Sequence, residues 1–248
     1  MKTDHHICVV TVTYGNRWKY LSKMLDRILE MQEFFNINIV VVDNTGHDNI
    51  VNLVKSKNKD IHIIDMHGNT GSAAGFKAGI KYAHRIICTD FVWLLDDDNL
   101  PERSSISSLL QEYENLGSDA NNAFLSMRSD RNQLKKAILE QKSIKLRPNT
   151  FLGFSLSKKL STKNNINNSE NNVCIEDISN YPCVNVDYAP YGGFFFHKSW
   201  IPRIGFPNEE YFIYSDDHEY TNRVVRMGGK IWLTPRSLVE DLECSSRY

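Results

Sequence analysis

Three consecutive carboxylates, Asp96, Asp97 and Asp98, follow the apolar run Val92–Leu95 and form the strongest candidate site in the chain. Alternate side chains of an extended backbone point the same way, so Asp96 and Asp98 are expected to converge while Asp97 points elsewhere. Converging like charges repel unless a cation lies between them, and Mg²⁺ or Mn²⁺ prefers oxygen ligands of this kind. The pattern predicts a metal site that a diphosphate can complete. The alternative is an acidic loop that only caps the helix expected to follow.

A second acidic pair, Asp216 and Asp217, lies between the aromatic run Tyr211–Tyr214 and Glu219. Burial beside aromatic groups raises the pKa of a carboxyl group, which suits a general base. The alternative is helix capping, in which Ser215 or Asp216 is the N-cap and Glu219 stands in the first turn. The two roles can coexist.

Glycines occur at two places where a backbone could approach a ligand. The segment Gly68–Gly79 is expected at a strand-to-helix turn, where amide groups can reach phosphate or ribose. It has neither Gly-x-Gly-x-x-Gly nor P-loop spacing, and tight packing of the helix on the sheet explains its small residues equally well. Gly192 and Gly193 precede Phe194–Phe196, which are expected in the core.

Polar residues also end the first two predicted strands. Asp43 could accept a hydrogen bond from a ribose hydroxyl or a base N–H, or it could cap the next helix. Thr13, Tyr14 and Arg17 follow the first strand, and Arg17 could pair with a phosphate or simply decorate the first turn of a helix.

The elements that must position these residues alternate along the N-terminal half. Apolar patterning predicts strands at 7–13, 37–42, 61–65 and 91–95, and helices at 17–35, 49–57 and 72–87. Such alternation predicts an α/β fold with a mainly parallel sheet and right-handed crossovers. Ligands of these sheets bind at the carboxyl ends of the strands, which is where the candidates lie.

The second half is less regular. The pattern predicts a helix at 101–116 opened by Pro101, a helix at 220–227, and strands at 123–128, 184–188, 231–234 and 238–239. The polar stretch 163–172 is predicted to be a mobile loop. No repeat or long linker divides the 248 residues, so a single domain over 1–248 is expected.

Composition excludes several classes of protein. The 29 basic and 30 acidic residues leave a net charge of −1, which gives no global attraction to nucleic acid. No apolar run is long enough to span a membrane, and no signal peptide is evident. Five scattered cysteines without a Cys-x-x-Cys pair argue against zinc and disulfide scaffolds. A cytoplasmic, soluble protein is expected.

The order of these segments, from about Ile7 to Asp241, resembles the inverting glycosyltransferases of family 2, which have the Rossmann-like GT-A fold. The opening strand and its loop, Asp43, the segment Asn69–Phe76, the Asp96–Asp98 run and the Asp216–Glu219 run each look like a motif of that family.

The resemblance implies a role for each candidate residue. The nucleotide would be bound by Thr13, Tyr14, Arg17, Asp43, Asn69, Gly71, Asp96 and Asp97. Mn²⁺ or Mg²⁺ would be held by Asp96, Asp98 and Asp241, the last standing where family members often have His. The base would be Asp217, with Asp216 as its competitor, and Gly192, Gly193 and Glu219 would contact substrate.

The implied activity is metal-dependent transfer of a sugar, galactofuranose or rhamnose, from a nucleotide-diphosphate donor with UDP as the expected nucleotide. The nucleotide would bind to residues 1–100, and residues 101–248 would hold the acceptor, a glycan or lipid-linked glycan of surface polysaccharide synthesis. Peripheral association with the inner face of a membrane is compatible with this. The alternatives are a nucleotide-sugar binding or regulatory module without transfer activity, and a phosphatase-type hydrolase. That hydrolase family expects Thr or Val where this chain has Leu100.

Overall fold

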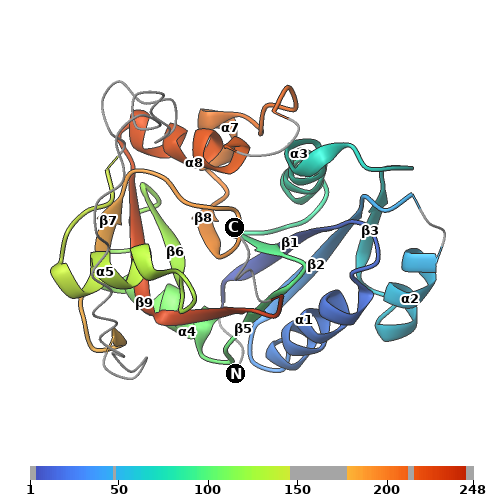
Figure 1. The fold of residues 1–248 in the computed structure, drawn as a ribbon, viewed down its shortest axis with the longest axis horizontal. Coiled ribbons are helices and arrows are strands. Elements are labelled where there is room, and N and C mark those ends of the chain that lie inside the picture. The colour runs from blue at the N-terminus through green and yellow to red at the C-terminus, as the bar shows by residue number, and fades with distance from the viewer. Residues whose placement is uncertain (1–3, 47–48, 146–177, 212–214, 244–248) are drawn as a thin grey trace, which may run out of the picture.

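Nine strands of the chain form one sheet in the computed structural model, which describes residues 4–46, 49–145, 178–211 and 215–243. The strand order is β3-β2-β1-β4-β8-β6-β9-β5, and β7 pairs with β9 beside this path. Figure 1 shows the sheet crossing the molecule between helices. The predicted loop at 163–172 lies outside the described residues.

The N-terminal half alternates strands and helices as predicted. Its elements are β1 (His6–Thr13), α1 (Trp18–Met31), β2 (Asn36–Asp43), α2 (Asn49–Lys57), β3 (His62–Asp65), α3 (Gly71–Arg85) and β4 (Phe91–Asp96). Strand β1 pairs in parallel with β2 and β4, and β2 pairs in parallel with β3. The carboxyl ends of all four strands therefore lie along one edge.

The C-terminal half completes the sheet with mixed pairing. Its elements are β5 (Asn99–Pro101), α4 (Ser105–Asn115), β6 (Asn122–Arg128), α5 (Asn132–Glu140), β7 (Val184–Val186), β8 (Phe194–His197), α7 (Trp200–Ile204), α8 (Asp216–Arg226) and β9 (Lys230–Asp241). Strand β8 runs antiparallel between β4 and β6, and β9 is parallel to β6. Six of the nine described strands thus share one direction, so the expected mainly parallel sheet is confirmed.

The start of the helix predicted at Pro101 is wrong. Pro101 instead ends β5, which pairs antiparallel with β9 at the end of the sheet, and the helix begins at Ser105. Proline has no N–H to donate and is tolerated on such an edge strand. Strand β8 and helix α7 are not among the predicted elements, because their short segments carry too few residues to show a period. Helix α5 is not predicted either, although it is as long as α2.

Two hydrophobic cores lie on opposite faces of the sheet. Helices α1, α2 and α4 cover one face, and α3, α5, α7 and α8 cover the other, as Figure 1 shows. Successive residues of β1 alternate between the cores: Val9 belongs to the first and Val10 to the second. Strands buried on both faces explain the continuous apolar runs of the sequence.

Two glycines of α3 allow the helix to pack closely against the sheet. A Cβ at Gly75 would lie 2.6 Å from Val12 Cγ1, and one at Gly79 would lie 2.3 Å from Val10 Cγ1. The helix can approach β1 this closely only because both positions lack a side chain. Across the described residues, no helix is long and apolar enough to cross a membrane.

Candidate active site

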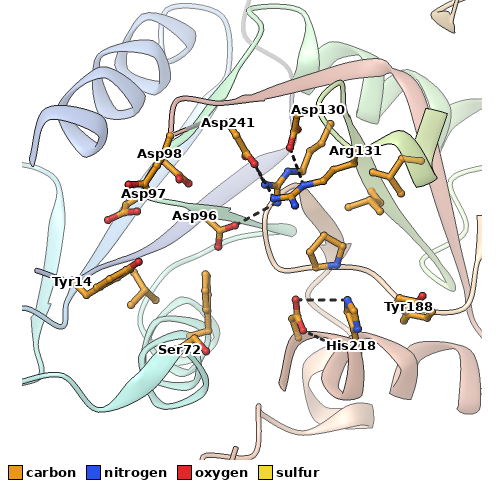
Figure 2. A pocket seen from close by; sticks show the side chains of 18 of the residues that line it. Tyr14, Ser72, Asp96, Asp97, Asp98, Asp130, Arg131, Tyr188, His218 and Asp241 are labelled. Atoms are coloured by element: carbon orange, nitrogen blue, oxygen red, sulfur yellow. Dashed lines mark hydrogen bonds and ion pairs between the residues drawn. The ribbon is translucent and has the colours of Figure 1, made fainter. Parts of the chain in front are cut away.

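A cavity of about 910 Å³ opens at the carboxyl edge of the parallel strands. Nine of the predicted site residues line it: Tyr14, Arg17, Asn69, Gly71, Asp96, Asp97, Asp98, Asp217 and Asp241. Figure 2 shows Asp96, Asp97 and Asp98 on one side of this cavity and His218 of α8 on another. The edge of the sheet thus gathers residues that are up to 227 positions apart in sequence, from Tyr14 to Asp241.

The three aspartates do not follow the expected alternation, because β4 ends at Asp96 and the next two residues form a turn. Asp97 is 2% exposed and accepts hydrogen bonds from Thr13 Oγ1 at 2.7 Å and Arg17 Nε at 2.8 Å. Asp98 Oδ2 accepts one from Arg17 Nη2 at 2.7 Å. Arg17 therefore holds the turn in place, and Asp97 is a supporting group rather than a free one.

Arg17 and Thr13 are engaged with the protein itself. The guanidinium of Arg17 also pairs with Glu243, so it contacts three carboxylates. Thr13 is fully buried, and its hydroxyl donates to Asp97 instead of lining the cavity. Both residues position the acidic turn, and Arg17 would have to exchange partners to bind a phosphate.

On the other side of the turn, Asp241 at the end of β9 is held by two arginines. Arg128 Nη2 and Arg131 Nη2 both donate to Asp241 Oδ2, the second at 2.9 Å, and Asn99 Nδ2 donates to Oδ1 at 2.8 Å. Arg128 Nη1 also lies 3.6 Å from Asp96 Oδ2. Asp96 and Asp241 therefore share the guanidinium of Arg128, and Figure 2 shows that the two carboxylates lie near each other.

The second acidic pair lies at the start of α8. Asp216 is 4% exposed and accepts a hydrogen bond from Ser72 Oγ at 2.8 Å, on the wall of a smaller adjoining pocket. Asp217 lines both cavities and accepts a hydrogen bond from the N–H of His218 at 2.7 Å. Ser215 has a positive φ of 68° and makes no capping hydrogen bond, so capping by Ser215 does not explain the cluster.

Burial raises the pKa of Asp96, Asp97 and Asp217 to about 7 each. The neighbouring charge of Asp216 raises the pKa of Asp217 further, and its hydrogen bond from His218 opposes this. Arg128 opposes the rise for Asp96, whereas Asp98, Asp241 and Asp217 add to it. The charge of Asp217 is among those that raise the pKa of Asp96, in keeping with the position of both carboxyl groups on one cavity.

The cavity carries an excess of negative charge. Its lining includes seven carboxylates and three guanidinium groups, an excess of four negative charges when all are ionised. A diphosphate could enter only with additional positive charge. Carboxylate oxygens of Asp96, Asp98 and Asp241 are the ligand type that Mn²⁺ and Mg²⁺ prefer, so the residues suit such a cation.

Within the described ranges, however, no three His, Cys, Asp or Glu side chains stand arranged around a point as metal ligands would. The oxygens of Asp98 and Asp241 accept from arginines, and those contacts set the present geometry. A cation at this place would have to compete with the guanidinium groups.

Five predicted site residues besides Thr13 do not line this cavity, although all are described: Asp43, Asp216, Gly192, Gly193 and Glu219, of which Asp216 lines the smaller pocket. Asp43 is 1% exposed and accepts from the N–H and hydroxyl of Thr45 at 2.9 and 2.6 Å, which closes a local turn. Glu219 forms an ion pair with Arg223 one helical turn away. The neighbouring Asn44, not Asp43, reaches the cavity.

The two glycines make room for the site's own side chains. A Cβ at Gly192 would lie 2.6 Å from Asp96 Oδ2 and 2.9 Å from Arg128 Nη1. Gly193 has a φ of 95° and links β4 to β6, since its N–H donates to Leu94 at 2.9 Å and its carbonyl accepts from Ser126 at 3.0 Å. These contacts account for both glycines without a ligand.

The sequence patterns missed several lining residues, among them Asn44, Ser72, Arg128, Asp130, Arg131, Tyr188 and His218. Arg128 had a usable signal, because it is the last residue of a predicted strand. That signal required knowing that β6 runs parallel to β4, which only the antiparallel β8 between them establishes.

Comparison with known proteins places this site in a family context. The model of "Glycosyl transferase family 2" matches residues 8–168. A galactofuranosyltransferase, GlfT1 of Mycolicibacterium smegmatis, is 30% identical over 104 residues, which are 42% of this chain and 33% of that protein. The chain therefore matches about a third of the length of that relative.

Solved structures show the same fold at low sequence identity. GalNAc-T7, solved with UDP, GalNAc and Mn²⁺, superposes with a TM-score of 0.66 at 12% identity over 96% of this chain and 44% of that one. The mannosyltransferase PcManGT from Pyrobaculum calidifontis, in complex with GDP-Man and Mn²⁺, superposes with a TM-score of 0.65 at 14% identity, over 99% of this chain and 59% of that one. Residues 1–349 of TarS from S. aureus superpose with a TM-score of 0.62 at 14% identity, over 95% of this chain and 60% of that one. The expected GT-A fold is confirmed.

Proposed function

Because the chain belongs to glycosyltransferase family 2, we propose that it transfers a sugar from a nucleotide-diphosphate donor to an acceptor hydroxyl with inversion at the anomeric carbon. One observation carries this proposal: Asp217 lines the same cavity as the Asp96–Asp98 turn, and burial raises its pKa to about 7. A carboxyl group with a pKa near neutral pH, in the same cavity as carboxylates suited to a cation, suits general-base catalysis.

The donor would lie between β4 and α3. Asn69, Gly71 and Tyr14 line that part of the cavity. Arg17 lies 5.0 Å from the centre of the Tyr14 ring, which is nevertheless 49% exposed and could contact a nucleoside. Asp96, at the end of β4, would face the sugar or ribose. This placement follows the rule that ligands of parallel sheets bind at the carboxyl edge.

A divalent cation, Mn²⁺ or Mg²⁺, would supply positive charge against the leaving diphosphate when bound by Asp98 with Asp96 and Asp241. Arg17 keeps Asp97 and Asp98 in position for this. The excess of negative charge in the cavity supports the need for such a cation.

Asp217 would take the proton from the acceptor hydroxyl. Its ionised form is the active one, and its neighbour Asp216 raises its basicity while Ser72 fixes Asp216 in place. The acceptor would lie near Tyr188, Pro190 and His218, which line the cavity around Asp217.

The finer assignment follows the resemblance and the galactofuranosyltransferase relative. We infer galactofuranose or rhamnose as the sugar, UDP as the preferred nucleotide, and a glycan or lipid-linked glycan of surface polysaccharide synthesis as the acceptor. Transfer in the cytoplasm, at the inner face of a membrane, would suit a lipid-linked acceptor.

The test is a screen of UDP-, GDP- and dTDP-sugars with Mn²⁺, scored by thermal stabilisation and by release of nucleoside diphosphate. We expect one donor to stabilise the protein and to be consumed when acceptor is added. Stabilisation without turnover, and unchanged in Asp217→Asn, would favour the alternative of a nucleotide-sugar binding module. No stabilisation by any donor would contradict the proposal.

A further inference from the structure

Arg128 occupies an unusual position for a cationic side chain. It is the last residue of β6, is 4% exposed, and contacts both Asp96 and Asp241. Its Nε is buried and, among the described residues, has no hydrogen-bond partner. A buried N–H without a partner is costly, so this guanidinium is bound to the protein through only part of its donor set.

The fold makes space for this arrangement. A Cβ on residue 192 would lie within 2.9 Å of both Arg128 Nη1 and Asp96 Oδ2, so any larger residue there would push these side chains from their present positions. Gly192 thus leaves room for the guanidinium beside the two carboxylates. The guanidinium lies within ion-pair distance of both Asp96 and Asp241.

Asp96 and Asp241 are also two of the three carboxylates suited to the cation. A guanidinium and a divalent cation repel each other, and both seek the same carboxylate oxygens. Arg128 faces Oδ2 of both carboxylates, and Asn99 donates to Oδ1 of Asp241, so a cation that binds through these oxygens must displace the guanidinium.

Building on the function proposed above, we propose that Arg128 and the divalent cation compete for Asp96 and Asp241, and that the guanidinium displaced by the cation binds the diphosphate of the donor. Arg128 is then a countercharge for the empty site and a phosphate ligand for the loaded one. The planar guanidinium matches the geometry of phosphate oxygens, and its unpaired Nε supplies a further donor.

This assignment makes two opposite predictions for one substitution. Arg128→Met removes the competing charge, so Mn²⁺ alone should bind about tenfold more tightly than to the wild type. The same substitution removes a phosphate ligand, so UDP at saturating Mn²⁺ should bind about tenfold more weakly. A purely structural role would not move the two affinities in opposite directions.

The experiment measures free Mn²⁺ by electron paramagnetic resonance in the absence of nucleotide, and UDP, GDP and dTDP binding by calorimetry at saturating Mn²⁺. Arg131→Met is the matched control: it removes a second contact to the same Asp241, but from a side chain that is 45% exposed and also pairs with Asp130. The Arg131→Met substitution should change the Mn²⁺ affinity less than threefold, because solvent screens the charge of the exposed Arg131. Arg103→Met, which removes a surface pair with Glu30, should change neither affinity.

Loss of the buried contacts could unfold Arg128→Met, so Arg128→Lys is measured beside it. Lysine keeps the charge but not the fork that spans two carboxylates, and its Mn²⁺ affinity should fall between those of the wild type and Arg128→Met. A Mn²⁺ affinity in either folded variant equal to or below that of the wild type would overturn the competition. An effect of Arg131→Met as large as that of Arg128→Met would overturn it as well, since only bulk charge would then matter.

The outcomes also separate this inference from the proposed function. If the wild type binds a nucleotide with Mn²⁺ while the Arg128 variants leave Mn²⁺ affinity unchanged, the competition is wrong and the proposed function stands. If the wild type binds no nucleoside diphosphate at saturating Mn²⁺, the proposed function fails, and the assignment of Arg128 to the diphosphate fails with it.

Discussion

The turn Asp96–Asp98 and the pair Asp216–Asp217 consist of the same residue type and open on the same cavity, but the fold gives them different neighbours. Arginines contact each carboxylate of the turn: Arg17 contacts Asp97 and Asp98, and Arg128 lies beside Asp96. Around Asp216 and Asp217, no Lys or Arg in the described part of the chain forms an ion pair. Their partners there are Ser72 and the N–H of His218.

The difference in neighbours explains how aspartates in one cavity can serve two functions. Carboxylates at a strand end, surrounded by cationic groups, are suited to exchanging those groups for a metal ion, which leaves the cationic groups available to a diphosphate. The pKa values of Asp96, Asp97 and Asp217 are all raised to about 7, so the clusters differ in their partners: Asp217 has no arginine partner among the described residues and can take up a proton from a substrate near neutral pH. The chemistry of each cluster therefore depends on its neighbours more than on its own sequence.

The sharpest test of the comparison is Asp217→Asn. The change keeps shape and polarity but removes the proton acceptor, so the single-turnover transfer rate should fall by about two to four powers of ten while donor affinity stays unchanged. Asp216→Asn, measured in parallel, should have a smaller effect. If Asp216→Asn abolishes transfer while Asp217→Asn keeps a near-normal rate, Asp216 is the base. If both variants keep a normal transfer rate, neither residue takes part in the mechanism.

On the other side, Asp98→Ala should lower nucleotide affinity at saturating Mn²⁺ by at least about tenfold, since it removes a carboxylate proposed to hold the cation. Calorimetry with UDP, with and without Mn²⁺, measures this. The exposed Glu114 of α4 offers a control, Glu114→Ala, which should leave affinity unchanged. Equal Mn²⁺-dependent affinity in Asp98→Ala and the wild type would show that the turn is not the cation site.

The pH dependence of transfer should reflect the second cluster. The pKa of Asp217 is raised to about 7, and only its ionised form accepts a proton, so kcat/KM should rise with pH and level off above about 7. Below about pH 6 the rate should fall roughly tenfold per unit. Asp217→Asn should abolish this limb of the profile. Its persistence would assign it to Asp96 or Asp97, whose pKa values are raised to about 7 as well.

The smallest expected effect is on stability. Asp97→Ala leaves the hydroxyl of Thr13 and Nε of Arg17 without their buried acceptor, which should lower the free energy of unfolding by about 1–3 kcal/mol. Urea unfolding measures this, with Glu114→Ala as the control. A cost below about 0.5 kcal/mol, the range of ordinary surface substitutions, would mean that Asp97 is as tolerant as strand alternation alone suggests.

Much of the N-terminal half could be predicted because its signals are local. Continuous apolar runs such as Ile37–Val42 read as strands buried on both faces, and the amphipathic pattern around Leu21–Ile28 indicated a helix. Parallel strands then had to end at one edge, which correctly grouped Tyr14, Asn69 and Asp96. Asp43 is assigned to the nucleotide although its partner Thr45 is only two residues away, a local turn that Asp commonly forms.

In the C-terminal half, pairing between distant segments decides the outcome. Pro101 satisfied the rule for a first helical turn, yet pairing with β9 places it in a strand. Asp96–Asp98 satisfied the rule of alternation, yet the contacts from Arg17 turn Asp97 into a buried support. Local rules fail here because β9 and α1 approach from more than 70 residues away.

The sequence by itself determined the α/β fold class and the two acidic clusters that define the chemistry. It also carried a resemblance to a family, which the family match confirms. Only the tertiary structure decided which carboxylates share a cavity and which cations accompany them. Residue types specify what a group can do, but pKa and countercharge depend on burial and on neighbours within a few ångströms. Arg128 and Asp241 lie 113 positions apart and meet only because β6 and β9 run side by side.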